Sequence, residues 1–174
     1  MLPVSRQLLS WCVTIGSALA CVLVLPTRLP GMELLGIGPN WLLIWVVAWS
    51  IRRRRTLMQA AVAGIALGFI QDGMTAPHPS HAVSLAIVGI LTVGLRKLRL
   101  IPEDFIEEDF VSVALIVFGM AFLAETVTAF QFIGSGERDL AEVWTYHQRV
   151  ALCSAILSSL WAPVVSFPLN RWGS

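Results

Sequence analysis

Six apolar runs, separated by short charged or Pro/Gly-containing connections, make up most of this 174-residue sequence. Apolar residues form 56% of the chain and charged residues only 13%, whereas ordinary soluble domains carry about 25% charged residues. One soluble core of this size cannot bury so many apolar side chains, and so few charges cannot build a water-facing surface. The composition therefore argues against a soluble enzyme and places the chain in a lipid bilayer. The net charge of +1 gives no global field that would attract nucleic acid.

Each run is expected to form a helix, so the sequence predicts an all-α integral membrane protein. Its single polytopic domain covers residues 1–174 and is a bundle of about six short transmembrane helices. A spanning helix needs roughly 20 residues, a length that the first, fifth and sixth runs supply. The other three must borrow flanking residues or pack inside a small bundle that thins the bilayer. The runs are Leu8–Leu25, Pro39–Ile51, Leu57–Gln71, His81–Leu95, Phe110–Phe132 and Val150–Phe167.

The first two runs need local interpretation. Arg6 and the Ala18-Leu19-Ala20 triplet resemble a secretory signal with its cleavage site. The apolar run continues to Leu25, however, so an uncleaved anchor is expected. Before the second run, residues 34–38 are expected to form a loop at the membrane interface, with Pro39 in the first turn of the helix.

The placement of the cations predicts the orientation, because cytoplasmic loops are enriched in Lys and Arg. With six crossings, nine of the twelve cations fall on one side of the membrane. Both termini are therefore predicted to be cytoplasmic. The larger group is Arg6, Arg52, Arg53, Arg54, Arg55, Arg96, Lys97, Arg99 and Arg171, and the smaller is Arg28, Arg138 and Arg149.

Two charged stretches lie on the predicted cytoplasmic side. The tetrad Arg52–Arg55 is expected to set topology and to attract anionic lipid headgroups, at about 1 kcal/mol for each cation near the surface. Residues 101–110 combine apolar side chains with five acids within 103–109, and predict an acidic amphipathic turn. This turn either docks a cytosolic partner or forms a solvated cap on the fifth helix.

Gly64, Gly68 and Asp72 recur at intervals of four residues and so share one helix face. Small residues at this spacing let a neighbouring helix approach closely. The face is either an internal packing seam that ends at a polar residue, or a partner-binding surface on which Asp72 binds the partner or caps a neighbouring helix. Gly16 and Ala20 form a second pair of the same kind in the first run.

Glu125 is an acid inside the fifth run, where a carboxylate must be paired, neutral or close to the headgroups. Arg149 begins the last run on the same predicted side and is the expected counter-ion, so that Asp72, Glu125 and Arg149 gather near the outer rim. The alternative is that Glu125 reaches the headgroups by itself. A proton relay would need further acids or histidines deeper in the membrane, and none is present.

No motif for catalysis or for metal binding is found in the sequence. His78 and His81 flank Pro79, which breaks any helical register, and no third ligand has a usual spacing, so loop polarity is the interpretation. Nucleophile elbows, metalloprotease motifs and phosphate-binding glycine loops are missing. The three cysteines lie in apolar runs, and no disulfide, metal or cofactor is expected.

Several of these motifs together resemble the rod shape-determining protein MreD family, in a form similar to its cyanobacterial members. The resemblance covers nearly the whole chain, including its length, its six short helices and its cytoplasmic termini. The motifs that carry it are Pro39-Asn40-Trp41-Leu42-Leu43 before the arginine tetrad, Gly64, Gly68 and Asp72, Phe110-Val111-Ser112-Val113-Ala114-Leu115, and Glu125-Thr126.

This resemblance implies a fold and a set of partners. MreD-like proteins are inner-membrane members of the cell-elongation machinery and are not known as enzymes. They bind MreC, a single-pass protein with a large periplasmic part, in a complex linked to the filament protein MreB, the glycosyltransferase RodA and a class B penicillin-binding transpeptidase. Their fold is placed near the S components of vitamin transporters, an analogy that does not transfer a ligand.

The expected function is a non-enzymatic scaffold that binds the membrane helix of MreC and helps to organise peptidoglycan synthesis and cell shape. The Gly64/Gly68 face is the first expected contact, with Asp72 orienting it, and the Gly16/Ala20 pair is the second. The alternative is an S-component-like subunit of a small-solute transporter, which would need a polar-lined cavity. A membrane enzyme acting on lipids is a third, weaker hypothesis.

Overall fold

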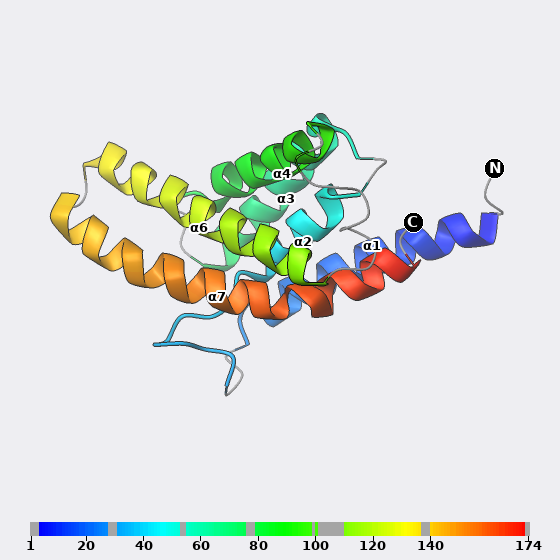
Figure 1. Ribbon diagram of the computed structural model, residues 1–174, viewed down its shortest axis with the longest axis horizontal. Coiled ribbons are helices and arrows are strands. Elements are labelled where there is room, and N and C mark those ends of the chain that lie inside the picture. Colours follow the sequence, from blue (N-terminus) through cyan, green and yellow to red (C-terminus); the bar gives the residue numbers. More distant parts are fainter. Residues whose placement is uncertain are drawn as a thin grey trace.

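A computed structural model describes residues 4–27, 31–52, 55–75, 79–98, 100, 110–136 and 140–172 of the chain. Within these residues the fold consists of six helices and contains no strand, which confirms the all-α prediction (Figure 1). The acidic stretch 103–109, together with Arg28, Arg53, Arg54, His78, Arg99 and Arg138, lies outside the described residues. The helices are α1 (Val4–Val24), α2 (Trp41–Ser50), α3 (Leu57–Met74), α4 (His81–Lys97), α6 (Phe110–Ser135) and α7 (Leu140–Trp172).

The shortest helix, α2, lies at the centre of the bundle and contacts all five other helices (Figure 1). Every residue from Leu42 to Ser50 is buried. A helix that is apolar on all sides is stable only when it is enclosed, and α2 is apolar throughout except for Ser50. At 10 residues it is about 15 Å long, roughly half the hydrocarbon thickness. Enclosure by longer helices explains how so short a segment belongs to a membrane bundle.

Polar contacts fix the start and the flank of α2. The side chain of Asn40 caps the helix by accepting a hydrogen bond from the Leu43 N–H at 3.1 Å, so α2 begins at Trp41 and not at the predicted Pro39. The Asn40 N–H donates to the Ser158 hydroxyl of α7 at 2.9 Å. The Trp45 indole N–H donates to the Ser17 hydroxyl of α1, also at 2.9 Å. Apolar packing alone would allow α2 to rotate or to slide against its neighbours, and these hydrogen bonds fix its position.

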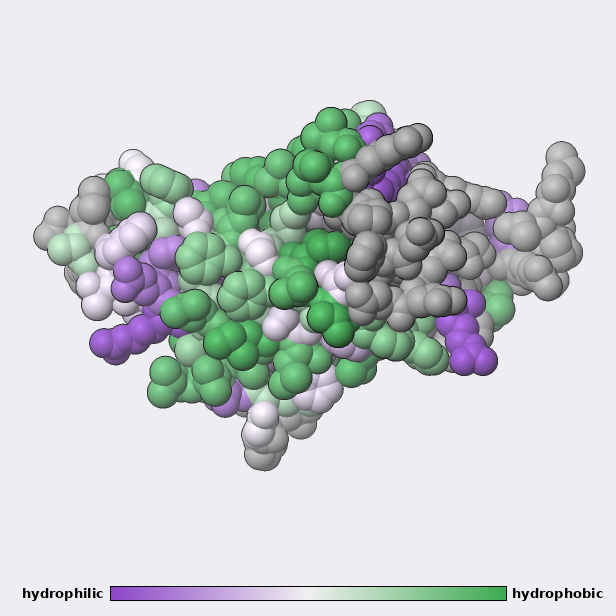
Figure 2. Space-filling view, viewed as in Figure 1, coloured by the Kyte–Doolittle hydropathy of each residue, from purple (hydrophilic) through white to green (hydrophobic). Residues whose placement is uncertain are grey.

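Four of the described helices, α1, α3, α6 and α7, are long and apolar enough to cross a membrane. Large apolar side chains are exposed along them, and Figure 2 shows a surface that is apolar over much of the visible face. A soluble protein does not expose such extensive apolar surface. The fold is therefore consistent with a membrane protein, whose lipid-facing side chains are those on the outside of the bundle.

The last helix begins earlier than the sequence predicted. The prediction placed its start at Val150, whereas α7 begins at Leu140 and continues through Pro163 and Pro168 to Trp172. Residues 140–149 are too polar for an apolar run, yet they continue the helix and pair with the end of α6. Figure 1 shows α6 and α7 extending together beyond α3 and α4. The loop predicted at residues 34–38 is confirmed as a tight turn in which Leu34 and Ile37 exchange two backbone hydrogen bonds.

The larger group of cations gathers at one end of the bundle, as far as the structure describes it. Arg96 at the end of α4 donates to the carbonyl oxygens of Ser50 at 3.4 Å and Arg55 at 2.7 Å, which joins the ends of α2 and α4 to the start of α3. The start of α1 and the end of α7, with Arg171, lie towards the same end of the molecule (Figure 1). This arrangement agrees with the predicted grouping of the cations.

The glycine face of α3 is an internal seam against α4. A Cβ atom on Gly64 would lie 2.5 Å from the Leu85 carbonyl oxygen, and one on Gly68 would overlap the backbone of Ala82. From the other side, a Cβ on Gly89 would lie 2.8 Å from the Ala60 carbonyl oxygen. The two backbones therefore touch along their length, as small residues at four-residue spacing permit. The packing-seam interpretation is the one that the structure supports for Gly64 and Gly68.

Adding a methyl group to this seam should destabilise the fold. We expect Gly68→Ala to lower the free energy of unfolding by about 1–3 kcal/mol or more, because backbone atoms and not flexible side chains occupy the space. Gly73→Ala in the same helix is the control, since nothing lies within 4 Å of its Cβ position. It should be neutral or stabilising, by up to about 1 kcal/mol. Thermal unfolding of the purified protein in detergent compares the two, and equal midpoints would contradict the seam.

Candidate functional site

Asp72, the last residue of the glycine face, bonds to the start of α4. Its Oδ1 accepts from the backbone N–H of His81 at 2.8 Å and from the His81 ring Nδ1 at 2.7 Å. Its Oδ2 accepts from the Ser80 hydroxyl at 2.8 Å. The side chain of Asp72 is only 10% exposed. The carboxylate thus caps a helix N-terminus, where the backbone N–H groups and the helix dipole favour a negative charge.

The capping function is one of the two that the sequence analysis considered for Asp72, and the structure supports it. A partner contact through Asp72 is not favoured, because three hydrogen bonds within the chain already occupy the carboxylate. His81, interpreted from the sequence as loop polarity, is the first residue of α4 and the ring partner of Asp72. No group of three possible metal ligands occurs within the part of the chain that the structure describes.

Polar side chains of α6 continue this network on the other side of α4. The Gln131 amide both accepts from the Ser80 N–H at 3.0 Å and donates to the Ser80 carbonyl at 3.2 Å. One turn further along α4, the hydroxyls of Ser84 and Thr128 lie 3.1 Å apart. Sequence reasoning did not find Gln131 or Thr128, although a polar amide inside an apolar run was a usable signal. The network joins α3, α4 and α6 at one end of the bundle.

Glu125 has partners other than the predicted Arg149. The Ser154 side chain of α7 forms a hydrogen bond with the Glu125 carboxylate, and His81 lies near enough for its charge to act on Glu125. Arg149 is exposed. Five residues separate Ser154 from Arg149, which turns the two side chains about 140° apart around α7. His81 is thus bonded to Asp72 and close enough to Glu125 for its charge to act there, and no ion pair between Arg149 and Glu125 is found among the described residues.

The second pair of small residues, Gly16 and Ala20, lines an open apolar groove between α1 and α7. The groove has a volume of about 430 Å³. Gly16 and Ala20 are exposed, and nothing lies within 4 Å of a Cβ placed on Gly16. No helix of the described structure covers this face, whereas α4 covers the Gly64/Gly68 face. The groove is lined by Val13, Gly16, Ser17, Ala20, Cys21, Val24, Trp41, Val164, Val165 and Pro168.

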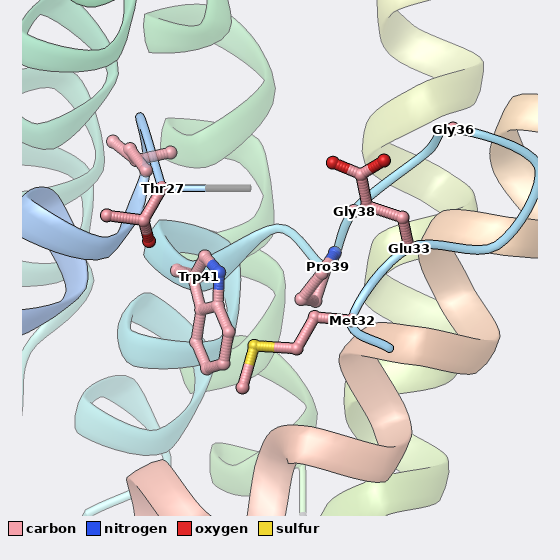
Figure 3. A pocket seen from close by; sticks show the side chains of 8 residues that line it. Thr27, Met32, Glu33, Gly36, Gly38, Pro39 and Trp41 are labelled. Carbon is pink, nitrogen blue, oxygen red and sulfur yellow. The ribbon is translucent and has the colours of Figure 1, made fainter. Parts of the chain in front are cut away.

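A smaller pocket of about 180 Å³ lies in the connection between α1 and α2. Figure 3 shows Met32 extending towards Trp41, with the Glu33 carboxylate on the far side of the loop. Ligand sites for drug-sized molecules usually have volumes of about 300–1,000 Å³. This pocket does not have the size of the polar-lined cavity that a vitamin-binding subunit needs.

The described members of the arginine tetrad, Arg52 and Arg55, lie at the opposite end of the bundle from Asp72. Burial lowers the pKa of Arg52 to about 10, and repulsion by Arg55 adds to this effect. Burial also lowers the pKa of Arg55, whose guanidinium carbon lies 4.2 Å from the centroid of the Trp49 ring. These cations are thus partly withdrawn from water and close to one another.

Apart from the α3–α4 seam of Gly64 and Gly68 and the exposed Arg149, the described site residues fall into three separate places: the polar cap around Asp72, the α1–α7 groove and the arginine end. Each is built from more than one helix or connection, so none could be assembled from spacing alone. Comparison with known proteins gives no match: no family model, no curated protein and no solved structure is significantly similar to this chain.

Removing the Asp72 carboxylate should loosen the junction of α3 and α4. We expect Asp72→Ala to reduce the free energy of unfolding by about 0.5–2 kcal/mol, the usual effect of losing a helix cap. Asp72→Asn, which keeps one acceptor oxygen, should cost less. Thr145→Ala is the control, because the Thr145 hydroxyl is exposed and bonds only within its own helix. Equal thermal unfolding midpoints for Asp72→Ala and Thr145→Ala would contradict the capping role.

Proposed function

We propose that this protein is a non-enzymatic scaffold of the rod-shape machinery, similar to MreD, and that it holds the membrane helix of MreC. Through MreC it would associate with MreB, RodA and a class B penicillin-binding transpeptidase. The proposal rests on the sequence motifs that resemble the family and on one structural observation, the open groove between α1 and α7. The protein would lie in the cell inner membrane with both termini in the cytoplasm, as the grouping of the cations favours.

The groove has the chemistry that a transmembrane helix requires. Helices in lipid associate by close van der Waals packing, for which small residues at four-residue spacing are the usual surface. Gly16 and Ala20 supply this spacing on α1, and Val164, Val165 and Pro168 supply the opposite wall on α7. Lipid chains can fill such a groove, but a rigid helix with a complementary face packs it more closely.

The helix α1 is well placed to present this face. It packs chiefly against α2 and α7, so most of its circumference remains uncovered within the described structure. Trp11, Ile15 and Leu19 are each more than half exposed on the face of α1 that points away from the groove. A partner helix in the groove would bury Gly16 and Ala20 and leave these three side chains to lipid. The expected first contact, the Gly64/Gly68 face, is occupied by α4 and is replaced in this proposal by the α1–α7 groove.

Filling the groove should weaken the complex without unfolding the scaffold. We expect Gly16→Leu and Ala20→Leu each to reduce the MreC retained in detergent co-purification by at least about tenfold, which corresponds to roughly 1.4 kcal/mol of binding free energy. Neither substitution meets a tightly packed neighbour, because Gly16 and Ala20 are exposed. Thermal stability should therefore stay close to that of the parent.

Gly119→Leu is the matched control, since Gly119 is an exposed glycine of α6 with nothing within 4 Å of its Cβ position. It should leave MreC retention unchanged. Retention of MreC at the parental level by both groove variants would refute the assignment of the groove. Recovery of an ATPase pair with a coupling subunit in place of MreC would refute the scaffold and favour the transporter subunit.

A further inference from the structure

Three arginines come together where α2 ends, α3 begins and α4 ends; we name Arg52, Arg55 and Arg96 the arginine corner. Arg96 reaches across from α4 and donates to the carbonyl oxygens of Ser50 and Arg55. The Arg55 guanidinium lies over the Trp49 ring. The α2–α3 connection and the last turn of α4 thus place their cations at one point on the end of the bundle.

The cations of Arg55 and Arg96 are not neutralised by a carboxylate among the described residues. The contacts of Arg96 are two backbone carbonyl oxygens, and that of Arg55 is an aromatic ring. Mutual repulsion and burial both act against this arrangement, as the lowered pKa values of Arg52 and Arg55 indicate. An external anion at the arginine corner would relieve both effects.

The arginine corner also has a surplus of hydrogen-bond donors. The Trp49 indole N–H and the Ser50 hydroxyl are buried there and form no hydrogen bond within the described structure. The acceptors that Arg96 uses at the arginine corner are the carbonyl oxygens of Ser50 and Arg55. Guanidinium groups present several N–H donors in a fixed plane that matches the oxygens of a phosphate group. The missing partner is therefore an oxyanion with several acceptor oxygens.

A lipid-facing stripe on α3 begins beside the arginine corner. Met58, Val62, Ile65 and Phe69 follow one another at intervals of three and four residues, and their exposed fractions lie between 41% and 77%. Residues at this spacing share one helix face. Met58 lies in the first turn of α3, three residues after Arg55, so the stripe starts at the same end of the bundle as the arginine corner.

We propose that the arginine corner binds the phosphate of an anionic glycerophospholipid, whose acyl chains lie along the Met58–Phe69 stripe of α3. The apolar stripe favours a lipid over a soluble phosphate, because it offers the acyl chains a surface that starts at the same end of the bundle as the headgroup site. The grouping of cations at this end matches the leaflet in which anionic lipids attract basic residues.

Native mass spectrometry of the full-length protein in detergent tests the proposal with two probes of equal chain length, phosphatidylglycerol and phosphatidylcholine. The parent should retain phosphatidylglycerol in preference, by about fivefold or more for each arginine that contacts the phosphate. Arg55→Gln should reduce this preference by about fivefold. The substitution leaves the bond from Arg96 intact, because the acceptor is the main-chain carbonyl of Arg55. Thermal unfolding confirms that the variant is folded.

Arg149→Gln is the matched control, an exposed cation near the start of α7, at the other end of the bundle, and it should keep the parental preference. Equal retention of the two lipids by the parent, or an unchanged preference in Arg55→Gln, would overturn the proposal. A preference that emerges only when the acids of residues 103–109 are replaced by amides would show that the chain's own acids take the lipid's place. Displacement by inorganic phosphate would assign the site to a soluble anion.

Discussion

The enclosure of α2 by five longer helices is the constraint on which the rest of the structure depends. A helix of 10 residues cannot cross the hydrocarbon layer, so its ends must find polar partners inside the protein. Asn40 and Ser158 satisfy one end, and Arg96 reaches the Ser50 carbonyl at the other. The neighbouring helices are thereby held at fixed heights around α2, which sets both the arginine corner and the rims of the bundle.

The bundle has two seams of small residues, one in its interior and one at its surface. The α3–α4 seam is closed, because the two helices are joined by a short connection and Asp72 locks its end to His81. The α1–α7 seam is open, because α1 packs mainly against α2 and α7 and no neighbouring atom covers Gly16. A chain that keeps one such face closed and another open suits a scaffold that receives a helix from outside.

The helices could be predicted from the sequence more fully than the site. Lipid offers the backbone no hydrogen-bond partner, so the backbone groups must bond to one another. An apolar run such as Phe110–Phe132 is therefore readily predicted to be a helix. The early start of α7 was missed because Trp144, Tyr146 and His147 interrupt the apolar pattern without interrupting the helix. Gly64/Gly68 and Gly16/Ala20 have the same spacing, and only tertiary contacts distinguish the filled face from the open one. Which side chains of α7 lie beside Glu125 depends on how α7 is rotated about its axis, and the spacing of residues within α6 does not indicate this rotation.

Site-specific photo-crosslinking in cells tests the proposal that the α1–α7 groove receives the partner helix. A photoreactive amino acid at Ala20 would lie in the groove, and one at Phe69 would lie on the outer face of α3, where the side chain is 64% exposed. We expect a crosslink to MreC from Ala20 and none from Phe69. A crosslink to MreC from Phe69 with none from Ala20 would contradict it.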